Sequence, residues 1–371
     1  MKRAIQLLLG IGVSALCVWL SMKDVHFTEV LTALRGANAF GFVLVMLVTL
    51  GGFWLRALRW RYFIEAGRPI SVASSFSATM IGFMANNVLP FRLGEFVRPW
   101  ALARREKLSK TTLLATVVVE RAIDMLTLLG IFGVSMMVHP IAENTDAGRL
   151  VQWGARVLIG LCVGLTVFVV ALERNRGLAA ALVQRVTGPL PGETRGQVAH
   201  MLERFLEGLG LFRDWAKLAK VFALSFAMFL CFALALGISL WSLDIALPWY
   251  AGLVMLVITA IGIMVPAAPG YIGTLNIACT AGLALFGVGK AQSVPFSWFY
   301  FFSQWLPITA VGLIYLNREG LSLRSLGQAK PAEDERVQAR NATATFATAR
   351  TTSSTSRAVM VANSGSVMAR R

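Results

Sequence analysis

The chain has 371 residues, of which 56% are hydrophobic and 15% are charged, and its formal net charge is +16. Soluble domains average about 45–50% apolar and about 25% charged residues, so this composition excludes an ordinary soluble domain and indicates a membrane protein with several spans. The basic residues stand in blocks between apolar runs, as they do in cytoplasmic loops. We therefore expect no nucleic-acid partner.

Cysteine and histidine give no sign of a metal site or a cofactor. The four cysteines all lie inside apolar runs without Cys-x-x-Cys spacing, and the three histidines are far apart without carboxylate or cysteine companions. The chain also contains no Walker motif. We expect no metal, no cofactor and no ATP-driven step.

Two apolar runs near the N-terminus predict the first two spanning helices. The run 4–21 follows Lys2 and Arg3, and no small-x-small cleavage pattern follows it, so we expect an uncleaved helix with a cytoplasmic N-terminus. The second span, 40–60, runs into a set of arginines: Arg56, Arg59, Arg61 and Arg68. That end should therefore face the cytoplasm.

The next apolar run is short, rich in serine and basic on both flanks, so both of its ends prefer the cytoplasm. We expect a re-entrant pair of half-helices over 72–98, with a break at 86–90. Such backbone is tolerated at membrane depth only where protein or a water-filled cavity surrounds it. Polar groups such as Asn86, Arg92 and Glu95 each cost roughly several kcal/mol there, which favours a functional use.

The span 111–138 carries Glu120, Arg121 and Asp124 in its first half. Spacing of i to i+4 puts the two carboxylates on one face, and Arg121 lies within reach of Asp124, or of Glu95 across helices. After it we predict a span at 150–172 and, because apolar residues repeat at +4 and +3, an amphipathic cytoplasmic helix at 195–215.

The second half predicts spans at 218–243 and 295–316, with an interrupted pair at 251–288 between them that is split by prolines and glycines at 266–273. This pair should begin and end outside; charge alone does not decide how deep it goes. Residues 321–371 are rich in Ala, Thr, Ser and Arg and predict a disordered cytoplasmic tail after a membrane domain at 1–320.

Charge placement supports this topology, with both termini cytoplasmic. Of 35 Lys and Arg residues, four fall in the proposed external segments: Lys23, Arg35, Arg149 and Lys290. The expected fold class is thus all-α, a polytopic transmembrane helix bundle with two interrupted elements that open to opposite sides. Such pairing is typical of the binding site of an inverted-repeat transporter. The alternative is that the prolines and glycines merely kink packed helices.

The charges around the first break suggest a binding role. Arg92 and Arg121 are suited to holding a lipid phosphate through paired donors, with the acidic residues keeping the arginines in place. The alternative is an ion cluster at the cytoplasmic side that only fixes orientation. The aromatic residues at 298–305 predict packing and an interfacial belt.

Three motifs resemble the lysylphosphatidylglycerol synthase transmembrane-domain family, also called flippase-like integral membrane proteins. They read Asn86-Asn-Val-Leu-Pro-Phe-Arg-Leu-Gly-Glu95, Val119-Glu-Arg-Ala-Ile-Asp124 and Pro266-Ala-Ala-Pro-Gly-Tyr-Ile-Gly-Thr-Leu-Asn276. They occur in the family's order, and the resemblance covers about residues 1 to 320. Many members have glycine at the position of Tyr271 and often glutamate at that of Asn276.

The resemblance implies a bacterial inner-membrane protein that moves a lipid between leaflets, without the aminoacyl-transferase domain of the synthases. The expected cargo is a phospholipid or a polyprenyl-phosphate-linked lipid with an anionic head group. The alternatives are a membrane-embedded enzyme that modifies lipid head groups, and a scaffold for such an enzyme. The candidate substrate-binding residues are Asn86, Asn87, Arg92, Glu95, Arg98, Glu120, Arg121, Asp124, Pro269, Gly270, Gly273 and Asn276.

Overall fold

The computed structural model describes residues 27–64, 69–89, 92–138, 215–264 and 269–323, with isolated residues at 12–25 and 153–185. These stretches are helices joined by short turns, and they contain no strand. All of them except Leu323 belong to one compact unit, Met1–Ser322. Four predicted segments fall wholly or largely outside the described residues and stay predictions: 4–21, 150–172, 195–215 and 321–371.

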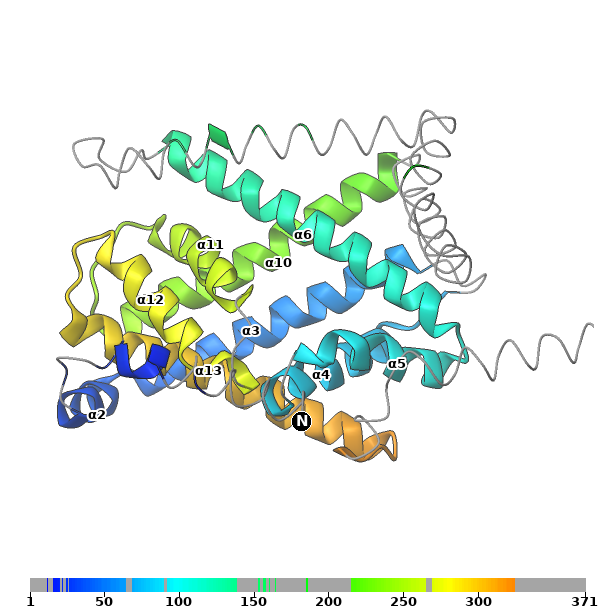
Figure 1. Ribbon diagram of the computed structural model, residues 1–371, viewed down its shortest axis with the longest axis horizontal. Coiled ribbons are helices and arrows are strands. Elements are labelled where there is room, and N and C mark those ends of the chain that lie inside the picture. Colours follow the sequence, from blue (N-terminus) through cyan, green and yellow to red (C-terminus); the bar gives the residue numbers. More distant parts are fainter. Residues whose placement is uncertain are drawn as a thin grey trace, which may run out of the picture. The chain divides into compact units, whose positions relative to one another are not determined.

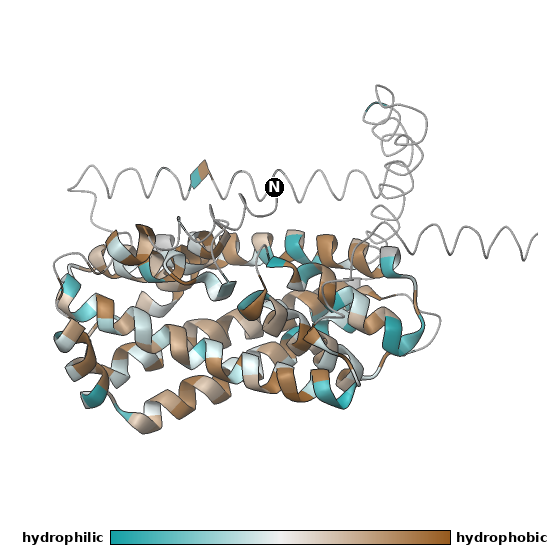
Figure 2. Ribbon diagram, turned by 60° about the horizontal axis from the view of Figure 1, so that its bottom comes forward, coloured by the Kyte–Doolittle hydropathy of each residue, from teal (hydrophilic) through white to brown (hydrophobic). Residues whose placement is uncertain are grey.

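Three described helices are long and apolar enough to cross a membrane: α3 (Ala39–Trp60), α10 (Trp215–Ser242) and α13 (Lys290–Arg318). The fourth long helix, α6 (Lys110–Val138), has 29 residues. At about 1.5 Å per residue it is longer than the roughly 30 Å hydrocarbon core. Hydrophobic residues follow the long helices, and hydrophilic residues gather toward their ends (Figure 2). The chain is therefore a multi-pass integral membrane protein with an all-α fold.

Helix contacts fix the directions of the long helices relative to α3. Against α10, the backbone N–H of Asn38 donates to the carbonyl of Ser242, and Arg59 contacts Ser225, so these two helices are antiparallel. α6 is also antiparallel to α3. The contacts that show this are Trp60 with Thr116 and Arg56 with Asp124.

In contrast, α13 runs parallel to α3. Phe42 packs on Phe299, and further along both helices the side chain of Gln304 donates to Thr49. α3 and α13 therefore run in one direction, and α6 and α10 run in the other.

Two pairs of short helices lie between the long ones. The first pair is α4 (Val72–Val88) with α5 (Gly94–Glu106), and the second is α11 (Ala251–Met264) with α12 (Thr274–Ala284). In Figure 1 the first pair lies in the right half and the second in the left half. The longest of these helices, at 17 residues, spans about 26 Å, less than a full membrane crossing.

The helix order is the same in both halves of the chain. A long helix, a short pair and another long helix follow one another as α3, α4/α5, α6 and again as α10, α11/α12, α13. Because α3 and α10 run in opposite directions, as do α6 and α13, the second half is inverted relative to the first. These are the directions expected of an inverted repeat.

Local sequence explains where several helices begin. The side-chain oxygen of Asn38 accepts hydrogen bonds from the N–H groups of Phe40 and Gly41 and so caps α3, and Ser71 caps α4 in the same way. Two bounds differ from the predicted ones: α5 continues through Pro99 to Glu106, and α13 begins at Lys290 rather than at 295.

One helix lies in the loop predicted between the first two spans. This helix, α2 (Phe27–Gly36), is mostly exposed and buries Val30.

Within the first short pair, two glycines allow close backbone contact. A Cβ atom at Gly94 would collide with the carbonyl oxygen of Gly82 and with the side chain of Asn86. The first of these is a backbone atom and the second is held by a hydrogen bond from the N–H of Gly94, so both have little freedom to move. We expect Gly94→Ala to lower the free energy of unfolding by about 1–3 kcal/mol, the usual cost of overpacking.

Gly51→Ala is the matched control, because no atom lies within 4 Å of its added Cβ in α3. There the better helix propensity of alanine should leave stability unchanged or raise it by up to about 1 kcal/mol. Thermal unfolding in detergent measures both variants. Equal stability of Gly94→Ala and the parent would contradict this packing.

The helix directions also generate a topology test. Ser109, before α6, and Ala291, in the first turn of α13, are exposed and lie at opposite ends of the bundle. In a chain whose four cysteines are replaced by alanine, we expect Ala291→Cys to react with an impermeant maleimide from outside the cell. Ser109→Cys should react only after permeabilisation, because basic residues surround it. Labelling of both from one side would contradict the arrangement.

Candidate functional site

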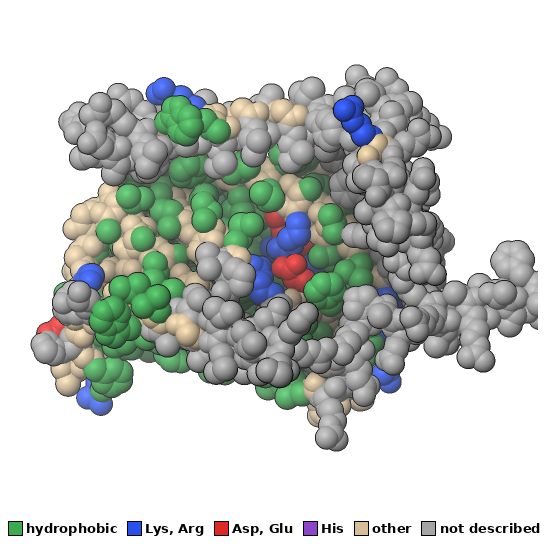
Figure 3. Space-filling view, viewed as in Figure 1, with side chains coloured by type: hydrophobic (Ala, Val, Ile, Leu, Met, Phe, Trp, Pro, Cys, Tyr) green, Lys and Arg blue, Asp and Glu red, His purple; other side chains and the backbone are tan. Residues whose placement is uncertain are grey.

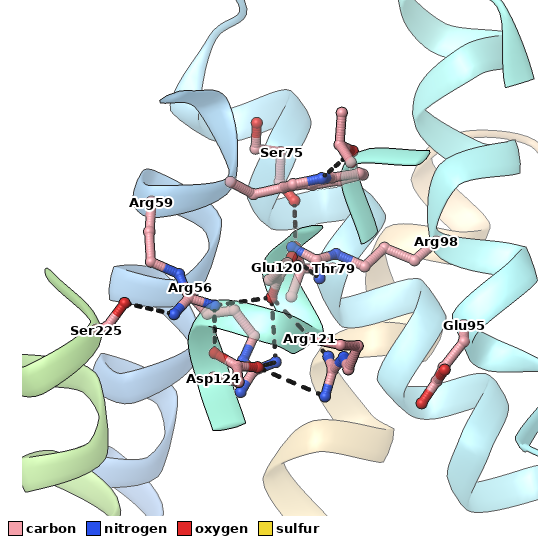
Figure 4. A network of polar contacts seen from close by, with 12 residues as sticks. Arg56, Arg59, Ser75, Thr79, Glu95, Arg98, Glu120, Arg121, Asp124 and Ser225 are labelled. Atoms are coloured by element: carbon pink, nitrogen blue, oxygen red, sulfur yellow. Dashed lines mark hydrogen bonds and ion pairs between the residues drawn. The ribbon is translucent and has the colours of Figure 1, made fainter. Parts of the chain in front are cut away.

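A buried network of ionised side chains joins three helices (Figure 4). Its centre is Glu120 of α6, which is fully buried. One carboxylate oxygen of Glu120 accepts hydrogen bonds from Arg56 at 3.2 Å and from Arg59 at 3.1 Å, and the other accepts one from Arg98 of α5 at 2.7 Å. A single carboxylate thus binds α3, α5 and α6 together.

Asp124, one helical turn further along α6, binds the same face of α3. It forms an ion pair with Arg59 at 2.7 Å and accepts a hydrogen bond from Arg56 at 3.3 Å. Arg121 lies on the other side of it, with 3.6 Å between the charged atoms. Residues three or four apart share one face of a helix. The two arginines of α3 therefore both reach the two carboxylates of α6.

Two arginines of the network have further partners deep in the protein. Arg98 lies over the ring of Trp60 at 3.9 Å from the centroid, and Trp60 donates to Thr116 of α6. Arg59 donates to Ser225 of α10 at 2.6 Å. These contacts hold both guanidinium groups away from solvent and connect the network to a fourth helix.

Beside this network lies a cavity of about 200 Å³. Both interrupted elements line it, together with the long helices α3, α6, α10 and α13. Arg56 and Arg121 lie on one wall, and much of the remaining lining is aromatic or aliphatic, including Phe83, Phe232 and Leu256. Figure 3 shows basic and acidic side chains together in a hollow of this face, with hydrophobic side chains around them.

A second ion pair faces the cavity from the break between α4 and α5. Arg92 pairs with Glu95 at 3.2 Å and donates to the carbonyl of Ile263 in α11 at 2.9 Å. Its guanidinium also lies over the ring of Tyr271, 5.4 Å from the centroid. Arg92 therefore connects the two interrupted elements directly.

The backbone at both breaks adopts the left-handed conformation. Arg92 has φ 52° and Tyr271 has φ 61°, which is uncommon for residues other than glycine. Between the short helices of the second pair, Gly270 has φ 73° and lies close to Asn87 and Trp305. Both breaks thus approach each other at the cavity.

The two asparagines at the end of α4 line the cavity and also hold its first break in place. Asn86 accepts a hydrogen bond from the backbone N–H of Gly94 at 2.8 Å, which joins α4 to α5. Asn87 donates to Thr309 of α13 at 3.0 Å. Their side chains therefore have structural partners besides any ligand.

The structure brings half of the predicted substrate-binding residues to the cavity. The lining contains Asn86, Asn87, Arg92, Glu95, Arg121 and Gly270. Three others, Arg98, Glu120 and Asp124, belong to the buried network but are not among the lining residues. Their substrate-binding roles stay predictions.

The remaining three predicted residues are absent from the cavity lining: Pro269, Gly273 and Asn276. Asn276 is fully buried at the start of α12, where it accepts a hydrogen bond from the N–H of Gly273 and donates to Ser297. This geometry is that of a helix cap.

Sequence reasoning missed Arg56 and Arg59, which it used only as a basic flank. The available signal was their position inside an apolar span, three residues apart, facing an acidic pair at i and i+4 in a later span. The aromatic run of α13 packs in the hydrophobic core as predicted, and Tyr300, Phe301 and Trp305 in addition line the cavity.

Chemically, this arrangement is suited to binding an oxyanion that is attached to an apolar group. Arginine forks match phosphate oxygens, and the aromatic and aliphatic wall accepts hydrocarbon. Among the described residues, no group of three or more His, Cys, Asp or Glu side chains is arranged to hold a metal ion.

The central position of Glu120 predicts a large loss of stability in Glu120→Gln. The substitution keeps the shape but leaves three buried arginines with one carboxylate fewer, and breaking a buried ion pair costs about 3–5 kcal/mol. The control is Glu29→Gln on the exposed side of α2, which should change stability by less than about 0.5 kcal/mol. Thermal unfolding in detergent compares them, and equal effects would contradict the central role of Glu120.

Comparison with known protein families gives a match that covers most of the chain. The family model described as the lysylphosphatidylglycerol synthase TM region matches residues 7–312. The matched range includes both interrupted elements and the whole charged network. A search among curated proteins finds no match to the chain.

Proposed function

Because the chain belongs to the lysylphosphatidylglycerol synthase transmembrane-region family, we propose that it translocates a lipid with an anionic head group between the leaflets of a membrane. The cargo is a phospholipid or a polyprenyl-phosphate-linked lipid, and the process is not driven by ATP. The observation that supports this most is the cavity, which places arginines and an apolar wall side by side between two interrupted elements.

Such a cavity lowers the barrier that limits lipid movement. A charged head group crosses hydrocarbon slowly because it must lose its hydration. Arg56, Arg92 and Arg121 replace that hydration with fixed hydrogen-bond donors. The aromatic and aliphatic residues contact the part of the lipid's hydrocarbon chain that lies next to the head group. The head group then moves through protein and the acyl chains stay in lipid.

We also propose that the two short helix pairs are the gates of this path, in the cytoplasmic membrane of a bacterium. α4/α5 is re-entrant from the cytoplasmic side and α11/α12 from the outer side. The contact of Arg92 with Ile263 holds the two breaks together. When this contact breaks and one helix pair moves away, the cavity opens to the side of that pair. Opening to one side at a time is the principle of alternating access.

A head-group-modifying enzyme has less support from the site. Glu120 and Asp124 are buried and bound to arginines, so neither is available as a general base. Glu95 is the only carboxylate among the described lining residues, and it pairs with Arg92.

The test is a leaflet assay in proteoliposomes that follows the exposure of labelled head groups. We expect the parent protein to accelerate transfer and Arg92→Ala or Arg121→Ala each to slow it about tenfold or more, since a hydrogen bond to a charged group is worth about 1.5–3 kcal/mol. Arg104→Ala is the control, because Arg104 is exposed on α5 and absent from the cavity lining.

Three outcomes would contradict the proposal. Transfer at the rate of protein-free vesicles would exclude translocation of the lipids tested. Equal slowing by Arg104→Ala would show that the effect does not come from the cavity. A chemically modified lipid, detected by mass spectrometry, would favour the enzyme instead.

A further inference from the structure

Among the described residues, the charges of the cavity lining and of the buried network joined to it do not cancel. Together they contain five arginines but only three carboxylates: Arg56, Arg59, Arg92, Arg98 and Arg121, with Glu95, Glu120 and Asp124. The excess is two positive charges. In a low-dielectric site such an excess is unfavourable unless an anion compensates it.

The contact distances locate this excess. Glu120 is bound by Arg98 at 2.7 Å, Asp124 is bound by Arg59 at 2.7 Å, and Glu95 pairs with Arg92 at 3.2 Å. Each carboxylate thus has a different arginine as its nearest partner. The guanidinium groups left over belong to Arg56 and Arg121.

Both of these arginines face the cavity. Arg56 shares the two network carboxylates at 3.2 and 3.3 Å, and Arg121 approaches them only to 3.6 and 3.9 Å, beyond hydrogen-bond length. The side chain of Arg121 is 36% exposed and that of Arg56 is 7% exposed, whereas that of Arg59 is 0% and that of Arg98 is 3% exposed.

We infer that the cavity is selective for a lipid whose head group ends in a phosphate monoester, which carries two negative charges, over phosphodiester lipids, which carry one. This inference rests on the proposed function and narrows its cargo. A phosphate monoester has a second pKa of about 6, so it is close to dianionic at neutral pH and offers three terminal oxygens. Two leftover guanidinium groups on one wall match that charge and those acceptors.

The inference is tested by titrating the purified full-length protein in a nonionic detergent with two ligands of equal chain length. Dodecyl phosphate is the monoester and dodecyl methyl phosphate is the singly charged diester. At about pH 8 the monoester is fully ionised. We expect dodecyl phosphate to bind about tenfold more tightly or better, a difference of about 1.4 kcal/mol, measured from ligand-dependent thermal stabilisation. Equal affinities would overturn the inference.

Inorganic phosphate separates a lipid head group from a free ion. It presents the same charge without the hydrocarbon that Phe83, Phe232 and Leu256 are placed to contact. We expect it to bind at least about tenfold more weakly than dodecyl phosphate. Equal binding of the two would show a site for the free ion and overturn the lipid assignment.

A pair of variants tests the charge itself. Glu95→Gln and Arg92→Gln break the same ion pair, but the first raises the excess to three positive charges and the second lowers it to one. We expect severalfold tighter binding of dodecyl phosphate in Glu95→Gln and severalfold weaker binding in Arg92→Gln. Weaker binding in both would mean that the pair acts only through structure, and it would overturn the charge argument.

Arg104→Gln, away from the cavity, is the control and should bind as the parent does. Unfolding temperatures without ligand show whether each variant is folded. Failure of this inference differs from failure of the proposed function: equal binding of both dodecyl ligands leaves translocation possible, whereas selective binding without any transfer in proteoliposomes would contradict the function alone.

Discussion

The carboxylate of Glu120 is the contact on which the arrangement of the first half depends. It lies in α6 and accepts hydrogen bonds from arginines of α3 and α5, so three helices share one buried charge. In an apolar surrounding, any of these charges without its partner would be strongly destabilising, so the helices pack with the faces that pair the charges. Arg59 extends the network to α10 through Ser225, so it also connects the two halves of the chain.

The same network accounts for the polarity of the cavity. Arg98 and Arg59 are the nearest partners of Glu120 and Asp124 and lie away from the cavity, whereas Arg56 and Arg121 belong to the network and also line the cavity. The proposed site for an anion thus rests on surplus donors rather than on a dedicated loop. Much of the remaining lining is aromatic and aliphatic, so the cavity is suited to an amphiphile rather than to a free ion.

The two interrupted elements meet at the cavity because small and polar residues allow it. Gly82 and Gly94 bring α4 and α5 into backbone contact, and Asn86 closes the break by accepting a hydrogen bond from Gly94. Arg92 then reaches across to the end of α11. Short helices that end inside the protein leave polar backbone groups at membrane depth, which is tolerated where a cavity or protein surrounds them.

Sequence by itself determined the features that depend on local chemistry. The long apolar helices, both breaks and the direction of each span were predicted from hydropathy, proline, glycine and the placement of arginine, and α3, α6, α10 and α13 overlap four of the predicted spans. Only the tertiary structure decided which side chains the charged and polar residues bind. Arg56 and Arg59 read as a basic flank, yet they bind carboxylates more than sixty residues away. Arg98 turns from the cavity toward Trp60, and Asn276 caps a helix. Such roles depend on which helix faces meet, and spacing along one chain does not contain that information.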